Sequence, residues 1–377
     1  GELDTKDRRA VLKDYSNAVY APPGYLLFSR EETLMAQPFD AGKGKTIGDA
    51  VPIAEQVDLT YLRGGGSLFS VSQNGVLAYM SGVAGRDVQL TWFDRSGKAQ
   101  GTVGSPGVLG SPAISPDGTT VAVDRASSQS SFYDLWLNDL VRGTSSRFTF
   151  GPRANQFPIW SPDGRHIAFR STRGGMAEAA VFQRTIGGGA EDEVLDNAPG
   201  TKLPTDWSRD GRYIIEQTSN DPKTRTDIWV LPLFGDRKPF PYVRTEFGET
   251  GGKLSPDGKL LAYASDETSR NEVYVQTFPE HRGKWQVSAN GGDRPVWSRD
   301  GKELFFIDAD RKLMAVPAKG GPKFEAGAPQ PLFDTLVGAE GRYDVGTNGR
   351  FLIPAQIQQN AGAPMTVVIN WQALLKK

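Results

Sequence analysis

The sequence predicts an all-β fold, a β-propeller built from four-stranded blades, and three observations support this prediction. A four-residue turn motif recurs along the chain at a nearly constant spacing. Each clear copy is followed by short runs of aliphatic, β-branched and aromatic residues, which favour strands. Glycine and proline together make up 69 of 377 residues, about 18%, whereas their usual share of a protein is roughly 12%. A strand-forming repeat of ~40–50 residues is typical of a β-propeller.

The repeated turn reads Ser-Pro-Asp-Gly at 115–118, 161–164 and 255–258, and Ser-Arg-Asp-Gly at 208–211 and 298–301. Proline presets φ at the second position, aspartate can close the turn through its side chain, and glycine permits a positive φ. We expect each copy to form the hairpin between the two innermost strands of one blade. Counting degenerate copies, the final glycines are Gly24, Gly75, Gly118, Gly164, Gly211, Gly258, Gly301 and Gly349.

Each repeat contains the elements of one blade, in a fixed order. The strand before the turn ends on an aromatic or apolar residue such as Trp160, and a β-rich run such as 165–169 follows the turn. A second run comes about ten residues later, as at 227–229, and then a more polar third run, as at 284–287. The strand before the turn and these three runs make four strands, which is one blade. We expect the tryptophans before the turns to pack in the core between blades.

The number of turns sets the expected number of blades. Eight copies predict eight blades, and seven is the alternative if the weak copy at Gly24 is not a turn of this kind. Helical periodicity is absent over any useful length, apart from one expected turn at 372–376. Because no segment has the composition of a linker, we expect one domain that covers residues 1–377.

Closure of the ring is predicted from the two chain ends. The last blade has three expected strands, at 342–345, 350–354 and 365–371. The N-terminal run Asp7–Lys13 has no blade of its own, and we expect it to complete the eighth blade. A ring closed in this way leaves no exposed sheet edge.

Composition excludes several classes of function. The net charge is −1, so a broad surface for nucleic acid, which needs a basic excess, is not expected. Cysteine is absent and only His166 and His281 are present, which rules out thiolate and multi-histidine metal sites. Each Asp-Gly turn supplies one carboxylate, whereas calcium loops need several oxygen ligands in one segment. We therefore expect no metal and no cofactor.

Membrane and catalytic signals are also missing from the sequence. No apolar run approaches the ~20 residues that span a bilayer, so any membrane contact would run through a segment outside this chain. Gly-x-Ser-x-Gly is absent, and the glycine runs at 64–66 and 187–189 lack the Lys-Ser/Thr and helix of a phosphate loop. We expect His166 to be a partly exposed structural residue, and His281 and the acidic run 191–193 to be solvated.

The candidate binding residues lie on the loops that enter each innermost strand, where propellers usually meet ligands. They are a mixed set rich in arginine and amides, which suits a polar or acidic ligand or a peptide. The alternative is that these charges only keep that face soluble. The candidates are Tyr61, Arg63, Arg153, Asn155, Gln156, Lys202, Glu249, Asp293, Arg294, Arg342 and Tyr343.

The repeats resemble those of TolB-type propellers, whose pattern is aromatic-x-Ser-Pro-Asp-Gly-x-x-aliphatic-Ala-aromatic, and residues 160–169 match it closely. The segments 16–28, 34–40 and 367–371 further resemble the C-terminal propeller of bacterial membrane-anchored serine/threonine protein kinases. That resemblance implies a sensor domain on the extracytoplasmic, periplasmic face. The chain itself lacks the glycine-rich loop, His-Arg-Asp and Asp-Phe-Gly motifs of a kinase.

Three functional hypotheses follow from these features. The first is a non-catalytic recognition domain, the extracytoplasmic sensor of a receptor-like kinase, which binds a small polar ligand, a peptide or an envelope protein. The second is a TolB-like periplasmic protein-interaction scaffold. The third is a propeller enzyme such as a lyase or a peptidase fragment, which the missing nucleophile motif and the scarcity of histidine disfavour.

Overall fold

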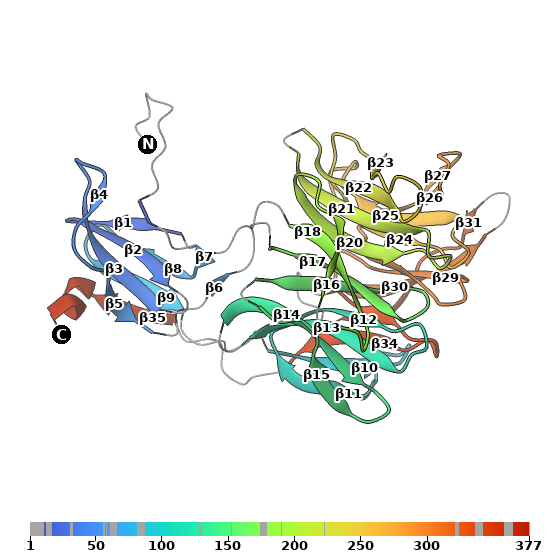
Figure 1. The fold of residues 1–377 in the computed structure, drawn as a ribbon, viewed down its shortest axis with the longest axis horizontal. Helices are drawn as coiled ribbons and strands as arrows, with labels where there is room; N and C mark the ends of the chain where they lie inside the picture. The colour runs from blue at the N-terminus through green and yellow to red at the C-terminus, as the bar shows by residue number, and fades with distance from the viewer. Residues whose placement is uncertain are drawn as a thin grey trace. The chain divides into compact units, whose positions relative to one another are not determined.

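The structure is a computed structural model, and it describes most of the chain. The described residues are 11–12, 17–30, 33–55, 57, 59–60, 66–80, 87–127, 130–151, 153–173, 179–189, 191–221, 223–320, 324–335, 342–357 and 365–376. The described elements are β-strands with one 3-10 helix (Figure 1). The all-β prediction is therefore confirmed.

The chain divides into two compact units. The single domain expected over residues 1–377 stays a prediction. Unit 1 comprises residues 1–87 and 357–377, and unit 2 comprises residues 88–356. The sequence around the boundaries at Asp87 and Ile357 does not have the composition of a linker, so nothing in the sequence predicts a division at these positions.

Unit 1 is built from three small antiparallel sheets and the terminal helix. Its core contains Leu27, Leu34, Leu77 and Trp371, all fully buried. The first sheet contains β1 (Val19–Ala21), β2 (Tyr25–Arg30), β3 (Thr33–Asp40), β4 (Lys45–Thr46) and β5 (Val51–Ala54). The second contains β8 (Phe69–Val71), β9 (Val76–Met80) and β35 (Met365–Ile369). The third pairs β6 (Leu59–Thr60) with β7 (Gly66–Ser67), and the helix is η1 (Trp371–Lys376).

The C-terminal segment packs against the first hairpin of unit 1. The rings of Tyr25 and Trp371 meet edge to face with centroids 5.5 Å apart. The backbone N–H of Trp371 donates to the carbonyl of Gly75 at 3.1 Å, and the Gln372 amide donates to the carbonyl of Pro22 at 3.3 Å. The first hairpin and the C-terminal segment thus form one core.

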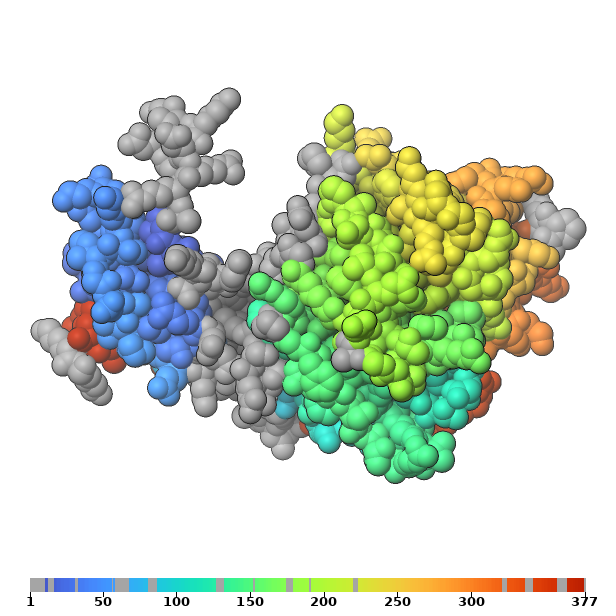
Figure 2. Space-filling view, in the orientation of Figure 1, coloured from blue at the N-terminus to red at the C-terminus, as the bar shows by residue number. Residues whose placement is uncertain are grey.

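Unit 2 contains five sheets whose strands follow one another directly in the sequence. Figure 2 shows their surface in chain order, from green through yellow to orange. The first two sheets are β12 (Leu109–Ile114), β13 (Thr120–Ser127), β14 (Ser130–Asp139) and β15 (Thr144–Arg147), and then β16 (Asn155–Trp160), β17 (His166–Ser171), β18 (Ala180–Thr185) and β19 (Glu193–Asp196). The next two are β20 (Thr201–Trp207), β21 (Tyr213–Asp221), β22 (Arg225–Pro232) and β23 (Phe240–Val243), and then β24 (Glu249–Leu254), β25 (Leu260–Ser265), β26 (Glu272–Thr277) and β27 (Lys284–Gln286). The fifth sheet contains β28 (Asp293–Trp297), β29 (Glu303–Ile307), β30 (Lys312–Lys319), β31 (Glu325–Ala326) and β32 (Gln330–Asp334).

The sixth sheet of unit 2 joins strands from both ends of the unit. Its order is β11 (Ala99–Gly107), β10 (Val88–Phe93), β34 (Phe351–Gln356) and β33 (Asp344–Val345). Val88 pairs with Gln356 and Phe93 with Phe351 in an antiparallel register. Figure 1 shows the two early strands in cyan beside the late strand in red.

The predicted last blade is corrected by this pairing. The expected strands at 342–345 and 350–354 do pair, as β33 and β34, but the third, at 365–371, pairs with β9 in unit 1. The reason is that β10 occupies the free edge of β34, while Val368 of β35 packs into the core of unit 1. The expected closing strand Asp7–Lys13 lies outside the described residues apart from 11–12. Neither eight nor seven blades is confirmed.

The turn motif forms the expected hairpin in all six sheets of unit 2. At the second copy, the Ser161 hydroxyl donates to Asp163 Oδ1 at 2.6 Å and the N–H of Gly164 donates to the carbonyl of Ser161 at 2.9 Å. Gly164 has φ +69°, and a positive φ recurs at every final glycine of the motif except Gly24. In five sheets of unit 2 the hairpin joins the first two strands, as predicted, and in the sixth it joins β33 and β34. The strand before the turn is called the first strand of its sheet below.

The core of unit 2 lies between neighbouring sheets. Trp297, which precedes a turn, is 6% exposed and packs with Val275 of one sheet and Phe306 of the next. Its indole N–H donates to the carbonyl of Lys253 in the preceding sheet at 3.1 Å. Burial of one such side chain stabilises the fold by about 1.5–3 kcal/mol. The expectation that these tryptophans pack between sheets is confirmed.

Candidate ligand-binding channel

The first strand of each of five sheets carries a register shift before its turn. In β16, β24 and β28 the residue four positions before the turn serine has a positive φ: Phe157 (57°), Gly251 (67°) and Arg294 (56°). A bulge of this kind re-aims a side chain and is enriched beside functional sites. The same sequence position therefore faces the same space in different sheets.

That space is a cavity of about 790 Å³ lined by the first strands of all six sheets of unit 2. Its charged lining has five basic and three acidic side chains, so at neutral pH it favours an anionic ligand. The eight residues are Arg209, Lys253, Arg294, Arg299, Arg342, Asp206, Asp293 and Asp344.

One end of the cavity carries the arginines predicted from the sequence. The Arg342 guanidinium lies over the ring of Phe157, 4.8 Å from its centroid, a cation–π contact that fixes the side chain. The Arg294 side chain is 22% exposed, and its backbone N–H donates to Asp293 Oδ1 at 2.7 Å. The Tyr343 hydroxyl, buried beside them, has no hydrogen-bond partner among the described residues, and burial raises its pKa well above the usual value. This end offers two cations and one hydroxyl donor.

A buried carboxyl lies behind this end. Asp124 of β13 is 1% exposed, and its Oδ1 accepts a hydrogen bond from the backbone N–H of Ser111 at 2.8 Å. Burial raises the pKa of Asp124 to about 6, and the positive charge of Arg342 opposes that rise. Protonation of Asp124 would leave the charge of Arg342 more available to a ligand.

The middle of the cavity is held by contacts between adjacent sheets. Asp206 Oδ2 accepts from the backbone N–H of Leu254, and Asp344 Oδ2 from that of Ile114, both at 2.7 Å. The Lys253 ammonium donates to the carbonyl of Thr205 at 2.5 Å and lies 4.0 Å from Asp206. The carboxylates of Asp206 and Asp344 therefore accept hydrogen bonds from backbone N–H groups and lie near neighbouring cations.

Four of the eleven predicted site residues line this cavity, and the other five that the structure describes do not. Arg153 is exposed and Gln156 half-buried, and neither contributes to the lining, while Tyr61 and Arg63 lie outside the described residues. The cavity-lining members are Asp293, Arg294, Arg342 and Tyr343. That the eleven residues bind a ligand remains a prediction.

Three predicted residues are buried in structural contacts instead. Asn155 donates to Asp134 Oδ1 at 3.2 Å, and the Lys202 ammonium donates to the carbonyl of Ala198 at 2.7 Å. Glu249 is fully buried and accepts from the Thr245 hydroxyl, and burial raises its pKa. Asn155 and Glu249 are the first residues of β16 and β24, and Lys202 is the second residue of β20. At these positions the side chain lies between two sheets and not in the cavity.

Sequence reasoning missed the charges in the middle and at the turn end of the cavity. Arg209 and Arg299 stand where three other copies of the turn have proline, and that departure from the motif was the available signal. Asp206, Lys253 and Asp344 each precede the first residue of a turn by two positions, a register that the bulge obscures. No separate motif marks them.

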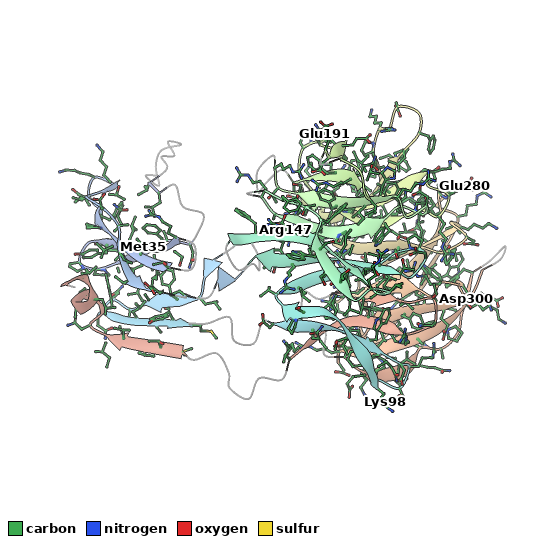
Figure 3. All side chains as sticks on the ribbon, turned by 60° about the horizontal axis from the view of Figure 1, so that its bottom comes forward. Met35, Lys98, Arg147, Glu191, Glu280 and Asp300 are labelled. Atoms are coloured by element: carbon green, nitrogen blue, oxygen red, sulfur yellow. The ribbon has the colours of Figure 1, made fainter. Side chains whose placement is uncertain are left out.

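The remaining polar expectations are partly confirmed. His166 is half-buried on β17, and His281 is exposed, with its ring 4.3 Å from that of Tyr242. Within the acidic run 191–193, Asp192 is buried: its side chain is 3% exposed and pairs with Arg173 and Arg184. Figure 3 shows Glu191, like Glu280 and Lys98, at the periphery of unit 2.

Within the described part of the chain, no group of three or more His, Cys, Asp or Glu side chains is placed to hold a metal ion. Among the same residues, no helix has the length and apolarity required to cross a membrane.

Comparison with known proteins identifies the repeat. Residues 69–226 match the family model of the TolB beta propeller domain. An uncharacterized peptidase of Bacillus subtilis (strain 168), YuxL, is 26% identical over 201 residues, which is 43% of this chain and 30% of that protein. An uncharacterized protein of Agrobacterium fabrum is 31% identical over 90 residues, 24% of this chain and 29% of that protein. The chain thus spans less than a third of the length of these curated relatives.

Solved structures show the same fold at low sequence identity. A TolB-type protein of Agrobacterium tumefaciens superposes with a TM-score of 0.58 and 18% identity, covering 73% of this chain and all of that one. The hydrazine synthase of Kuenenia stuttgartiensis gives a TM-score of 0.52 and 15% identity over 80% of this chain and 94% of that one. The repeated Ser-Pro-Asp-Gly hairpins and the four-stranded sheets agree with these matches: residues 69–226 are similar to the TolB beta propeller domain, and the chain shares the fold of these solved structures.

Proposed function

We propose that unit 2 is a non-catalytic recognition domain that binds a small anionic ligand through Arg294 and Arg342. The observation that carries the proposal is a cavity of about 790 Å³ with five basic and three acidic lining side chains. Its volume is in the ~300–1,000 Å³ range of small-molecule sites. Charge-assisted hydrogen bonds from arginine to carboxylate or phosphate are about twice as strong as neutral ones.

The proposal treats the six sheets of unit 2 as six blades around this cavity. Two features support the arrangement. The six first strands all contribute lining residues, and the sheet of β10, β11, β33 and β34 combines strands from both ends of the unit. Such a ring would hold Arg294 and Arg342, on different sheets, at a fixed distance from each other. A preorganised pair loses less conformational entropy on binding.

The wider context of the domain is proposed from the chain ends. We propose that it faces the outside of the cytoplasmic membrane, as the sensor of a receptor-like serine/threonine kinase, with a TolB-like periplasmic scaffold as the alternative. Support comes from the end segments that resemble kinase-associated propellers, which pack together through Tyr25 and Trp371. The full-length gene tests this: an upstream kinase and membrane segment supports the sensor, and their absence favours the scaffold.

A catalytic role is the rival from another class, since one relative is named a peptidase. The described residues that line the cavity include no histidine, serine–histidine pair or cysteine. A screen with peptide and acidic oligosaccharide substrates separates the two. Turnover that is lost when Arg294 or Tyr343 is replaced would show that the cavity is an active site and not only a binding site.

Binding itself is tested with a panel of carboxylates and phosphates in a thermal-shift screen, followed by calorimetric titration of the hits. We expect Arg294→Ala with Arg342→Ala to weaken binding at least tenfold. Arg153→Ala is the matched control, because Arg153 is an exposed arginine that does not line the cavity. Equal affinity for the double variant and the wild type contradicts the proposal.

A further inference from the structure

The second position of the turn motif forms a set of its own in unit 2. In all six sheets this residue lines the cavity, at the end opposite to Arg294 and Arg342 along each strand. Four sheets have an uncharged residue there, and two have arginine. The residues are Pro116, Pro162, Arg209, Pro256, Arg299 and Thr347.

The two arginines at this end lie close together. The Arg209 guanidinium donates to the carbonyl oxygen of Arg299 at 2.8 Å. Arg299 donates through Nε to the carbonyl of Val345 at 3.0 Å and through Nη2 to that of Ile114 at 3.3 Å. Burial lowers the pKa of Arg209, and the nearby charge of Arg299 lowers it further. Two like charges held together at a cavity end repel each other, and an anion between them would relieve that repulsion.

Nearby acids neutralise this pair only in part. Asp344 lies 3.7 Å from Arg299 but already accepts the backbone N–H of Ile114. Asp206 attracts Arg209 and is shared with Lys253, 4.0 Å away. Three cations therefore face two carboxylates in the middle and turn-end portions of the cavity. At the other end, Arg294 and Arg342 have Asp293 beside them in the lining and the buried carboxyl of Asp124 behind them.

The two ends are separated by the length of one strand. Arg294 and Arg299 lie five residues apart on β28 and its turn. Since a strand rises by about 3.3 Å per residue, the Cα atoms of these two arginines lie at most roughly 16 Å apart. The Arg299 guanidinium itself lies nearer the middle of the cavity, because its Nη2 is 3.7 Å from Asp344 Oδ2.

From this spacing, and resting on the proposed function of the cavity, we propose that the natural ligand is a linear molecule with an anionic group at each end. One group binds between Arg294 and Arg342, and the other between Arg209 and Arg299. The span between them passes one positive and two negative side chains, Lys253, Asp206 and Asp344. A further anionic group is disfavoured there, so a polar and uncharged connecting chain fits.

The test titrates the full chain with poly(ethylene glycol) α,ω-dicarboxylates whose lengths run from well below to well above ~16 Å. Matched monocarboxylates of each length are the reference probes. We expect an affinity maximum near the spacing of the two ends, with the best dicarboxylate at least tenfold tighter than its monocarboxylate. A flat dependence on length overturns the inference.

The repeat itself supplies a variant that removes the second site without disturbing the turn. Arg209→Pro with Arg299→Pro restores the Ser-Pro-Asp-Gly motif found at 115–118, 161–164 and 255–258. We expect the length optimum to disappear and dicarboxylates to bind as weakly as monocarboxylates. Because Arg299 also contacts two other sheets, Arg209→Pro alone is measured in parallel, with an expected loss of at least threefold.

Two controls separate this inference from the proposed function. Lys302→Gln removes a charge next to a turn but outside the cavity lining, and we expect it to leave the length optimum unchanged. If monocarboxylates bind through Arg294 and Arg342 but show no length optimum as dicarboxylates, the proposed function stands and the two-ended ligand is wrong. If replacing Arg294 and Arg342 leaves monocarboxylate binding unchanged, both are wrong.

Discussion

Arg342 lies over the ring of Phe157, 4.8 Å from its centroid, although Phe157 is in β16 and Arg342 comes just before β33. Both stand four positions before the first residue of a turn, Gly346 and Ser161 respectively. Equivalent positions of distant repeats therefore meet at one end of the cavity in unit 2. This register explains how single residues on separate repeats can form one binding site.

The turn glycine is the first point at which this register can be tested. Gly164→Val should lower the free energy of unfolding by at least ~1 kcal/mol, because a β-branched residue is strained at a positive φ. The φ is +69°, and a Cβ there would meet only Pro116 Cδ at 3.9 Å, so the cost comes from the backbone and not from a clash. Gly189→Val, at an open position without positive φ, is the control. Equal urea midpoints for both variants would contradict the assignment.

The turn aspartates should be structural and independent of metal. Asp163 Oδ1 accepts from the Ser161 hydroxyl and the backbone N–H of Arg165, and these bonds lower its pKa. Asparagine keeps that oxygen, so Asp163→Asn should change the melting temperature only slightly at pH 7. A chelator should leave the melting temperature of the wild type unchanged, and a drop after chelation would support a calcium site.

The buried Asp124 predicts a specific dependence of stability on pH. Burial raises its pKa to about 6, above the ordinary value of 3.8. Between these values the folded state holds a proton that the unfolded state has lost, so the free energy of unfolding falls as pH rises through this window. At about 1.4 kcal/mol per pKa unit, the contribution is on the order of 3 kcal/mol.

Asp124→Asn should remove this part of the pH dependence. The measurement is urea denaturation of both proteins at several pH values from 4 to 7, and the prediction concerns the difference between them. Other titrating groups are common to both proteins and cancel. A constant difference across the range would show that Asp124 does not titrate there.

Residues 88–356 should fold by themselves. Every strand of the six sheets in unit 2 lies within this segment, including the shared sheet of β10 and β34. The fragment should unfold in one cooperative thermal transition with a β-type circular dichroism spectrum. Truncation at residue 100, which removes β10, should abolish that transition, because β34 would lose its partner. A fragment 88–356 that lacks cooperative unfolding would contradict the division at Asp87.

The sequence predicted the repeated unit well and its assembly less well. Local signals specify a hairpin. Pro162 restricts φ and Gly164 permits a positive φ within the same four residues, so the positions of the turn, its flanking strands and Trp160 were predicted correctly. Partner choice for strands 260 residues apart depends on tertiary packing. Nothing in 365–369 signals that it pairs with β9 in unit 1 and not with β34.

The candidate site shows the same limit. Arg294 and Arg342 were identified because loops before first strands gather at one place in a propeller. Asn155, Lys202 and Glu249 were placed there by the same rule, but the strand begins before the bulge and turns their side chains between the sheets. The position of a bulge depends on packing against the neighbouring sheet, which no residue pattern within one repeat records.

The most direct test of the account is the position of a bound anion in a crystal of the complex with the best ligand of the thermal-shift panel. The account predicts density in the cavity of unit 2, within hydrogen-bond distance of Arg294 and Arg342 and near the hydroxyl of Tyr343. Density on the outer strands of the sheets or on unit 1, with an empty cavity in the same crystal, would contradict it.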